Sequence, residues 1–317
     1  MKKGNWLLVT DHNPTGTGGG AFASRAFINA FGQIVNKNLF VMASSNINGN
    51  LFDNTRIKII KVKPRTTIQK AIGITKIELH RFRRTFKEFL QKEKQNIELI
   101  IFDGSIIAGD LINFAQKNNI PAITIHHNVD GKYFKDSKSF LTFYGLTSFL
   151  IDRQQENAFK KSSLNMTLAK NDRIELEKRF EIPGRKSSYN IGCFEYSNKE
   201  NLSIKTQISK STNNITLAIT GSLAAYQTED AVTYFIRELL PSIESYQNLK
   251  IIISGRKPSK KIISFCKRDK RIKLISNPVN MDEIISEADI YVCPTRLGSG
   301  LKLRVMDGLR NGKPVLT

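Results

Sequence analysis

Short runs of isoleucine, leucine and valine alternate along the chain with longer amphipathic stretches. Nearly continuous aliphatic runs of this kind are typical of parallel strands that are buried on both faces of a sheet. The expected strands are residues 6–10, 39–43, 57–62, 99–102, 122–126, 215–220, 250–254, 272–275, 290–293 and 314–316. Because helical stretches lie between most of them, the pattern predicts doubly wound α/β sheets.

The expected strands form two series with a polar segment between them. Residues 181–214 contain Pro183-Gly184 and several serines and show no sustained hydrophobic period, which favours a connecting segment. We therefore expect an N-terminal α/β domain at residues 1–195, a linker at 196–213 and a C-terminal α/β domain at 214–317. Two such domains predict a cleft, and ligands of these sheets bind beyond the carboxyl ends of the strands.

Charge and cysteine content narrow the class of protein. The 317 residues include 49 Lys and Arg against 28 Asp and Glu, a net charge of +21. Such a field attracts nucleic acid, an anionic membrane or phosphorylated substrates, although a composition rich in Lys, Asn and Ile accounts for part of it. Three scattered cysteines favour neither a disulfide framework nor a paired metal site. With no apolar run of about 18 residues and no signal-peptide pattern, a cytoplasmic protein is the expectation.

The loop after the first expected strand is rich in glycine. Residues 11–20 end in Gly18, Gly19 and Gly20, and a helix pattern follows from residue 21. Glycines between a strand and a helix let backbone N–H groups approach an anion at the positive end of the helix. The spacing matches neither a Walker A loop nor a dinucleotide-binding motif. We expect these glycines to line the acceptor side of the cleft; the alternative is that they only form a tight turn.

Two adjacent histidines, His126 and His127, end the run at residues 122–126. An imidazole at this edge can take a proton, hydrogen-bond a sugar hydroxyl or coordinate a metal. No third ligand stands at a suitable spacing, so we expect no metal site. Asp103, at the end of residues 99–102, is a candidate neighbour across the sheet, and His126 and Asp103 are both expected on the acceptor side of the cleft. The alternative is that one histidine is packed and the other solvated.

The strongest signal lies at residues 294–316. The strand at 290–293 is followed by a glycine loop and then by a helix whose apolar residues Leu301, Val305 and Leu309 recur every four positions. The groups expected to bind a diphosphate are the amides of the loop and two nearby cations. They are Gly298, Ser299, Gly300, Arg296 and Lys302. Asp307, in the helix, is a candidate acceptor of hydrogen bonds from ribose hydroxyls.

Residues 298–315 resemble the donor-binding motif of the retaining glycosyltransferases of family 4. The matching family pattern is Gly-x-Gly-x-Lys-x-Lys-x-x-Glu followed by Gly-x-Pro-Val. It is matched here by Gly298, Gly300, Lys302, Arg304, Asp307, Gly312, Pro314 and Val315. Many members carry two glutamates separated by seven residues. These positions are Ser299 and Asp307 here, so one carboxylate contact to the donor sugar is expected to be lost.

The resemblance extends over most of the chain and implies the GT-B fold, with two Rossmann-like doubly wound domains facing a cleft. His127-Asn128-Val129-Asp130 is similar to the His-Asn-Val-Glu segment of the family, which makes His127 the candidate that contacts the donor sugar or phosphates. The turn Gly221-Ser222 and the loop Asn277-Pro278-Val279 are similar to segments on the nucleotide side. The family continues beyond the last matching strand, so we expect this sequence to be a fragment that lacks the C-terminal end of the second domain.

An activity follows from the resemblance. It implies transfer of a sugar from a nucleoside-diphosphate sugar to a glycan or lipid-linked acceptor, with retention, in cell-surface polysaccharide synthesis. His127 and Asp307 are then the candidate catalytic residues, and no metal or other cofactor is expected. Family members often carry a cation soon after the Gly-Ser turn, where this chain has Ala-Ala-Tyr-Gln. The alternatives are a GT-B-fold sugar-nucleotide epimerase and a non-catalytic nucleotide-binding homologue.

Residues 75–95 predict an amphipathic basic helix. Its apolar face is formed by Leu79, Phe82, Phe86, Phe89 and Leu90, and six lysines and arginines occupy much of the remainder. The helix is either docked on the core with a solvated basic face or placed against anionic lipid. The second reading puts the protein on the inner face of the membrane. No pattern for binding a specific nucleic acid is present.

Overall fold

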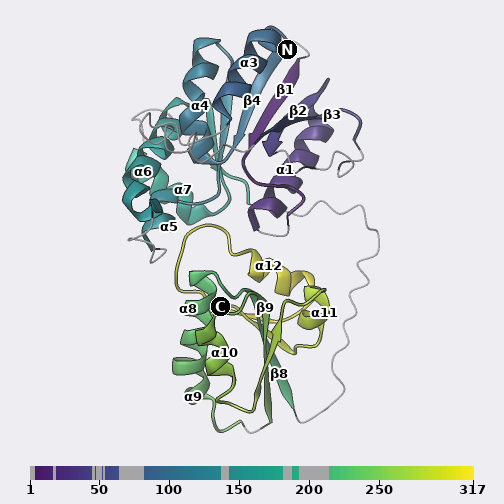
Figure 1. The fold of residues 1–317 in the computed structure, drawn as a ribbon, viewed down its shortest axis with the longest axis vertical. Coiled ribbons are helices and arrows are strands. Elements are labelled where there is room, and N and C mark those ends of the chain that lie inside the picture. Colours follow the sequence, from purple (N-terminus) through teal and green to yellow (C-terminus); the bar gives the residue numbers. More distant parts are fainter. Residues whose placement is uncertain are drawn as a thin grey trace. The chain divides into compact units, whose positions relative to one another are not determined.

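We describe the chain from a computed structural model. The structure describes residues 4–16, 19–44, 47, 52, 54–63, 82–136, 143–180, 188–192, 214–246 and 248–317, so that Gly18 and the expected linker lie outside the described residues. The chain forms two compact units, the first mainly from residues 1–198 and the second mainly from residues 199–317. Each unit has one sheet with helices on both faces (Figure 1).

The sheet of the first unit is parallel throughout. In spatial order its strands are β3 (Ile57–Val62), β2 (Leu39–Ser44), β1 (Asn5–Thr10), β4 (Ile97–Asp103), β5 (Ala122–His126), β6 (Leu164–Thr167) and β7 (Ser188–Asn190). Its helices are α1 (Gly19–Ile34), α3 (Arg83–Glu93), α4 (Ser105–Lys117), α5 (Asp130–Asp136), α6 (Phe143–Lys161) and α7 (Lys170–Phe180).

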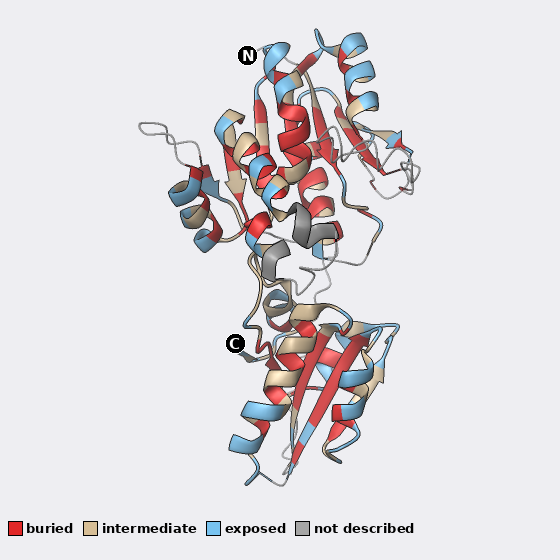
Figure 2. Ribbon diagram, turned by 60° about the vertical axis from the view of Figure 1, so that its left-hand side comes forward, coloured by how far each residue is buried: buried red, intermediate tan, exposed pale blue. Residues whose placement is uncertain are grey.

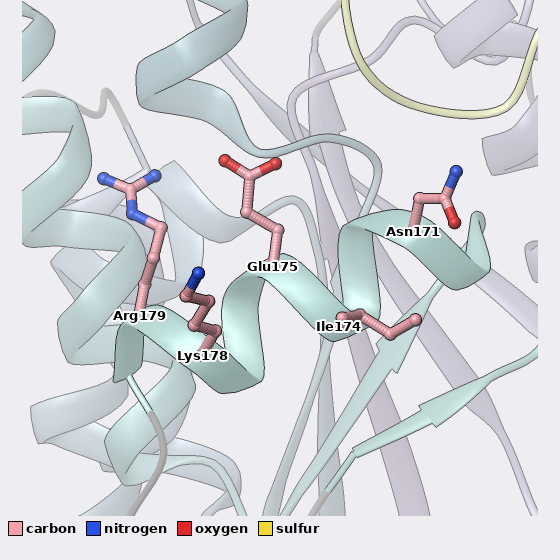
Figure 3. A pocket seen from close by; sticks show the side chains of 5 residues that line it. All are labelled: Asn171, Ile174, Glu175, Lys178 and Arg179. Atoms are coloured by element: carbon pink, nitrogen blue, oxygen red, sulfur yellow. The ribbon is translucent and has the colours of Figure 1, made fainter.

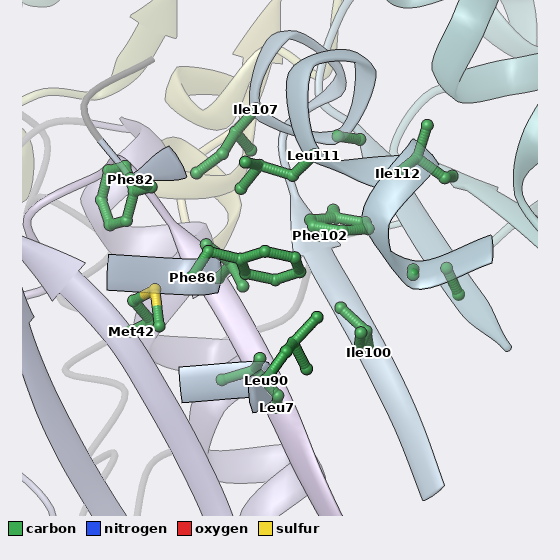
Figure 4. Close-up of a cluster of buried hydrophobic side chains, with 14 of the residues drawn as sticks. Leu7, Met42, Phe82, Phe86, Leu90, Ile100, Phe102, Ile107, Leu111 and Ile112 are labelled. Atoms are coloured by element: carbon green, nitrogen blue, oxygen red, sulfur yellow. The ribbon is translucent and has the colours of Figure 1, made fainter. Parts of the chain in front are cut away.

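Alternate residues of β1 enter different cores, because successive side chains of a strand point to opposite faces. Leu7 packs with the apolar sides of α3 and α4, and Phe86 of α3 and Phe102 of β4 are fully buried in the same cluster (Figure 4). Leu8 packs on the other face with α1, which contributes Phe27. Burying each such side chain contributes about 1.5–3 kcal/mol, so the central strands are fixed from both faces.

The second unit has a five-stranded parallel sheet. Its spatial order is β10 (Ile272–Ser276), β9 (Leu249–Arg256), β8 (Ile215–Ser222), β11 (Ile290–Val292) and β12 (Val315–Leu316). Its helices are α8 (Tyr226–Tyr234), a π-helical turn at Phe235–Leu239, α9 (Leu240–Ser242), α10 (Lys260–Cys266), α11 (Met281–Ser286) and α12 (Leu303–Arg310). Figure 2 shows the buried strands between helices with exposed outer faces.

Each sheet reverses its strand order once. In the first sheet the chain runs from β1 outward to β3 and returns to place β4 on the other side of β1; in the second, β11 returns to the other side of β8. Ligands of doubly wound sheets bind at the carboxyl ends of the strands where the order reverses. Ligand sites are therefore expected at the carboxyl ends of β1 and β4 and of β8 and β11.

The predicted fold class is confirmed, since both sheets are parallel and doubly wound. Two strands were not predicted. β6 is short and polar at Asn165, and β7 lies inside the polar stretch that was expected to connect the domains. Both are held by pairing to a neighbouring strand rather than by a long apolar run.

Candidate functional site

His127 and Asp103 form the centre of the switch-point edge in the first unit. The imidazole Nε2 of His127 lies 2.5 Å from Oδ1 of Asp103, and the Asp103 side chain is fully buried. Burial lowers the pKa of His127, but the charge and hydrogen bond of Asp103 more than offset this and raise it above its ordinary value. Burial raises the pKa of Asp103, but the same pairing lowers it overall. The two groups therefore form a buried ion pair.

Hydroxyl groups complete the surroundings of Asp103. The Thr10 hydroxyl, at the end of β1, donates to Oδ2 of Asp103 at 2.8 Å, and the Ser24 hydroxyl of α1 donates to the same oxygen. A buried carboxylate is costly unless its lone pairs are satisfied. These donors favour the charged form of Asp103, which holds His127 in one orientation and favours its protonated form.

His12 is a further residue of this edge that the sequence did not single out. Its ring lies 4.9 Å from the ring of His127, centre to centre. A Cβ atom at Gly20 would stand 2.5 Å from two atoms of the His12 ring. The absence of a side chain at Gly20 therefore leaves room for the His12 ring. This role is distinct from lining the acceptor side of the cleft, which was predicted for Gly18, Gly19 and Gly20.

His126 is the packed member of the histidine pair. Its ring is fully buried, and Nε2 lies 2.9 Å from Oδ1 of Asn165 on β6. Burial lowers the pKa of His126 to about 4, so the ring is neutral at pH 7. His126 therefore packs inside the first unit and does not line the acceptor side as predicted, because its ring is fully buried. His127 is partly accessible.

A second buried carboxyl group lies next to His127. Asp130, at the start of α5, accepts a hydrogen bond from the Ser105 hydroxyl, and its backbone N–H donates to the Gln155 side chain at 2.9 Å. Burial raises the pKa of Asp130 to about 6. This group is therefore destabilised in its charged form at neutral pH.

The glycine loop before α12 has a backbone conformation that only glycine adopts readily. Gly298 and Gly300, which flank Ser299, have φ values of +89° and +84°. Helix α12 begins at Leu303, later than expected, with Lys302 at its N-cap position. The loop therefore precedes the helix rather than forming its first turn.

The two cations predicted to bind diphosphate both have partners inside the unit. The Arg296 guanidinium donates to both oxygens of Asp230, at 3.3 and 2.9 Å, and lies 4.1 Å from the centre of the Tyr234 ring. The Lys302 ammonium donates to the Leu297 carbonyl at 3.2 Å. Arg296 is therefore drawn towards α8 by a neutralising carboxylate.

Arg304 of α12 was predicted only as a match to the family motif, and its guanidinium lies against the carboxyl end of β8. A Cβ atom at Gly221 would be 2.7 Å from Cζ of Arg304, and Nη2 of Arg304 donates to the Thr228 hydroxyl at 2.5 Å. The signal that points to it is its place in the family motif, two residues after Lys302. Its meeting with Gly221 is a tertiary contact that spacing does not reveal.

The remaining predicted residues lie at the same end of the second sheet. Ser222 ends β8, and its carbonyl accepts from the N–H of Ala225. Asn277 accepts through Oδ1 from the N–H of Lys257, and Val279 is fully exposed. On α12, Oδ1 of Asp307 lies 3.6 Å from Nη2 of Arg310. Pro278 lies in the same loop, after β10.

Other features of the described residues carry less chemistry. They contain no group of three or more His, Cys, Asp and Glu that could hold a metal ion. Within the same part of the chain, no helix is long and apolar enough to span a membrane. A shallow pocket lies along α7, lined by Asn171, Ile174, Glu175, Lys178 and Arg179 (Figure 3), and none of these is a predicted site residue.

The second unit matches a known family by sequence. Residues 214–317 match the family model of "Glycosyl transferases group 1". These residues form a group 1 glycosyltransferase domain. The match confirms the resemblance predicted from residues 298–315 and the predicted enzyme class. A comparison with curated protein sequences finds no match to this chain.

Solved glycosyltransferases share the fold of the chain. Alr3699/HepE from Anabaena, in complex with UDP and glucose, has a TM-score of 0.62 and 11% identity, covering 98% of this chain and 80% of its own. A glycosyltransferase from Rickettsia africae has a TM-score of 0.63 and 10% identity, covering 99% and 79%. The lipopolysaccharide outer core galactosyltransferase WaaB has a TM-score of 0.62 and 9% identity, covering 98% and 79%.

Proposed function

We propose that this chain is a glycosyltransferase that moves a sugar from a nucleoside-diphosphate sugar to a glycan or lipid-linked acceptor. The group 1 match of residues 214–317 supports the reaction class. The complex of Alr3699/HepE with UDP and glucose supports a nucleotide-sugar donor. The name of WaaB supports an acceptor of the cell-surface glycan class. The proposal includes retention of configuration and a role in polysaccharide synthesis.

The observation that carries the proposal is the ion pair of His127 and Asp103 at the switch point of the first sheet. A protonated imidazole held by a buried carboxylate is a fixed donor of positive charge. Such a group stabilises negative charge that develops on a departing diphosphate without having to reorganise. Asp103 is then the positioning residue and His127 the group that touches the donor.

The donor's nucleotide would bind at the carboxyl edge of the second sheet. The candidate groups for the diphosphate are Arg296, Lys302 and the amides of Gly298, Ser299 and Gly300, and those for the nucleoside are Asp307 and the residues around Gly221 and Asn277. Amides of a loop with positive φ can approach an anion closely. The domain limits that we propose remain residues 1–195 and 214–317, joined by 196–213.

A binding and turnover experiment tests the function. Purified protein is titrated with UDP-, GDP- and ADP-sugars while thermal unfolding is followed, because a ligand at a hundredfold excess over Kd stabilises by about 2.7 kcal/mol. Turnover is then measured with lipid-linked glycan acceptors, and the anomeric product is assigned by NMR. Formation of an isomeric sugar nucleotide without acceptor would indicate an epimerase. Binding without any transfer would indicate a non-catalytic homologue.

Helix α3 supports a peripheral position on the inner face of the membrane. Phe86 and Leu90 are buried against the core, whereas Arg84, Lys87, Lys92 and Lys94 are exposed. Each basic residue near an anionic bilayer contributes about 1 kcal/mol. Co-sedimentation with vesicles containing phosphatidylserine, and its loss when Lys87, Lys92 and Lys94 are changed to Glu, tests this part of the proposal. Binding that is equal with neutral vesicles would contradict it.

A further inference from the structure

The guanidinium of Arg304 lies close to the backbone of Gly221, where a side chain would collide with it. Gly221 directly follows the buried residues of β8 and has a φ of +148°. Its neighbour across the sheet is Gly255, with a φ of +159°. A Cβ atom at Gly221 would be 2.7 Å from both Cζ and Nε of Arg304. The missing side chain at Gly221 therefore lets the guanidinium lie directly on the backbone at the carboxyl end of β8.

One polar contact fixes the orientation of the guanidinium. Nη2 of Arg304 donates to the hydroxyl of Thr228, which is fully buried in the first turn of α8. A guanidinium has five N–H donors in a rigid planar fork. Thr228 uses one of them, so the group is held in place while keeping donors for a ligand.

Arg304 and Arg296 differ in whether an acidic residue pairs with the guanidinium. Among the ion pairs of the described residues, Arg296 is matched by Asp230, whereas none includes Arg304. The acidic residue in the first turn of α8, Glu229, lies 3.4 Å from Lys261. Arg304 thus places a positive charge beside the amino end of α8, which is itself positive. An anion bound there would relieve this unfavourable arrangement.

We propose that Arg304 supplies the cation that binds the diphosphate of the nucleotide, from helix α12, at the turn that ends β8. The inference rests on the proposed function and names a residue for its donor site. The residues after Ser222 are Leu223, Ala224, Ala225, Tyr226 and Gln227, none of which is charged. A guanidinium binds phosphate oxygens in a bidentate manner, and Gly221 and Thr228 orient it at the sheet's switch point.

The test compares a nucleoside diphosphate with its nucleoside. Isothermal titration gives Kd values of UDP and uridine, of GDP and guanosine, and of ADP and adenosine for the wild type, Arg304→Gln, Arg304→Lys and Arg271→Gln. Arg271 is a matched control because it directly precedes β10, the outermost strand of the same sheet, and forms an ion pair with Asp269. Thermal unfolding of each variant checks that it is folded.

For the diphosphate that the wild type binds, we expect Arg304→Gln to weaken binding at least tenfold and to change nucleoside binding less than twofold. Arg304→Lys should restore part of the loss, and Arg271→Gln should bind as the wild type does. The salt dependence of diphosphate binding should also become less steep in Arg304→Gln. Unchanged diphosphate affinity in folded Arg304→Gln would overturn the inference and leave the proposed function standing. Failure of the wild type to bind any of the three diphosphates would overturn both.

Discussion

The imidazole of His127 and the carboxylate of Asp103 meet across two neighbouring strands, at 2.5 Å, where β5 and β4 end. Their shared edge also contains the Thr10 hydroxyl from β1, so three strands converge on one buried charge. Each partner shifts the pKa of the other towards the charged form. Stability and the proposed catalytic role therefore depend on the same pair.

Asp103→Asn should destabilise the first unit strongly. Removing one partner of a buried ion pair costs about 3–5 kcal/mol, because the other charge is left unpaired. Urea unfolding at pH 7 measures the change. Asp152→Asn is the control, since Asp152 forms a half-exposed pair with Arg179 that is worth about 1 kcal/mol or less. If both variants lost the same free energy of unfolding, the buried pair of Asp103 and His127 would contribute no more to stability than the partly exposed pair of Asp152 and Arg179.

The same substitution should change the dependence of stability on pH. The raised pKa of His127 contributes stability that is present below pH 6.5 and is lost as the pH rises through the native pKa. The lowered pKa of Asp103 contributes stability above pH 3.8 that is lost as the pH falls. In Asp103→Asn the decline on the alkaline side should disappear. Unfolding curves between pH 6 and 9 would contradict this if both proteins declined in parallel.

Asp130→Asn should have the opposite effect on stability. Burial raises the pKa of Asp130 to about 6, so between pH 3.8 and 6 the native state binds more protons than the unfolded state. The wild type thus loses stability as the pH rises through this window. An uncharged side chain that can still accept from Ser105 should raise the free energy of unfolding at pH 7.5 by about 1–3 kcal/mol. The gain should shrink below pH 6 and be absent near pH 4.

Local pattern was enough to predict the fold class but not every element. β3 was predicted with its correct limits, and α3 with the correct buried face at Phe86 and Leu90, because apolar period and burial agree there. β7 was missed because three polar residues form it and only pairing to β6 selects the strand. Leu309 was one of the apolar residues whose spacing predicted the helix, yet its side chain is 55% exposed, because Gly308 is the buried residue of α12.

The candidate site was predicted where a residue follows a strand and missed where a contact depends on packing. Asp103 and His127 could be paired from sequence because parallel strands bring their carboxyl ends to one edge. The positions of His12 and Arg304 could not be predicted from sequence. His12 lies against Gly20, across a turn, and Arg304 lies against Gly221, which is far away in the chain. Such close approaches are set by tertiary structure and leave no periodic signal.

Gly20→Ala should act through His12. The new methyl group would displace the His12 ring, which lies against His127. We expect kcat/KM for sugar transfer to fall about tenfold, a loss of about 1.4 kcal/mol of transition-state stabilisation. A double-mutant cycle with His12→Ala is the control: the second substitution should add nothing once His12 is gone. Additive losses would show that Gly20 acts independently, for example through its own backbone.

Gly308→Ala tests how α12 is seated on the second sheet. A Cβ atom there would be 2.7 Å from a ring carbon of Tyr291 and 2.8 Å from Val315. Alanine favours a helix over glycine by about 1 kcal/mol, but overpacking costs about 1–3 kcal/mol. The cost should win because Tyr291 is fully buried and its hydroxyl is 2.6 Å from that of Thr220. Leu309→Ala, the exposed neighbour, should change the free energy of unfolding by less than about 0.5 kcal/mol. Because α12 carries Arg304, Gly308→Ala should also weaken nucleoside diphosphate binding. If the variant is destabilised but binds the diphosphate with wild-type affinity, the packing of α12 on the sheet does not affect the donor site.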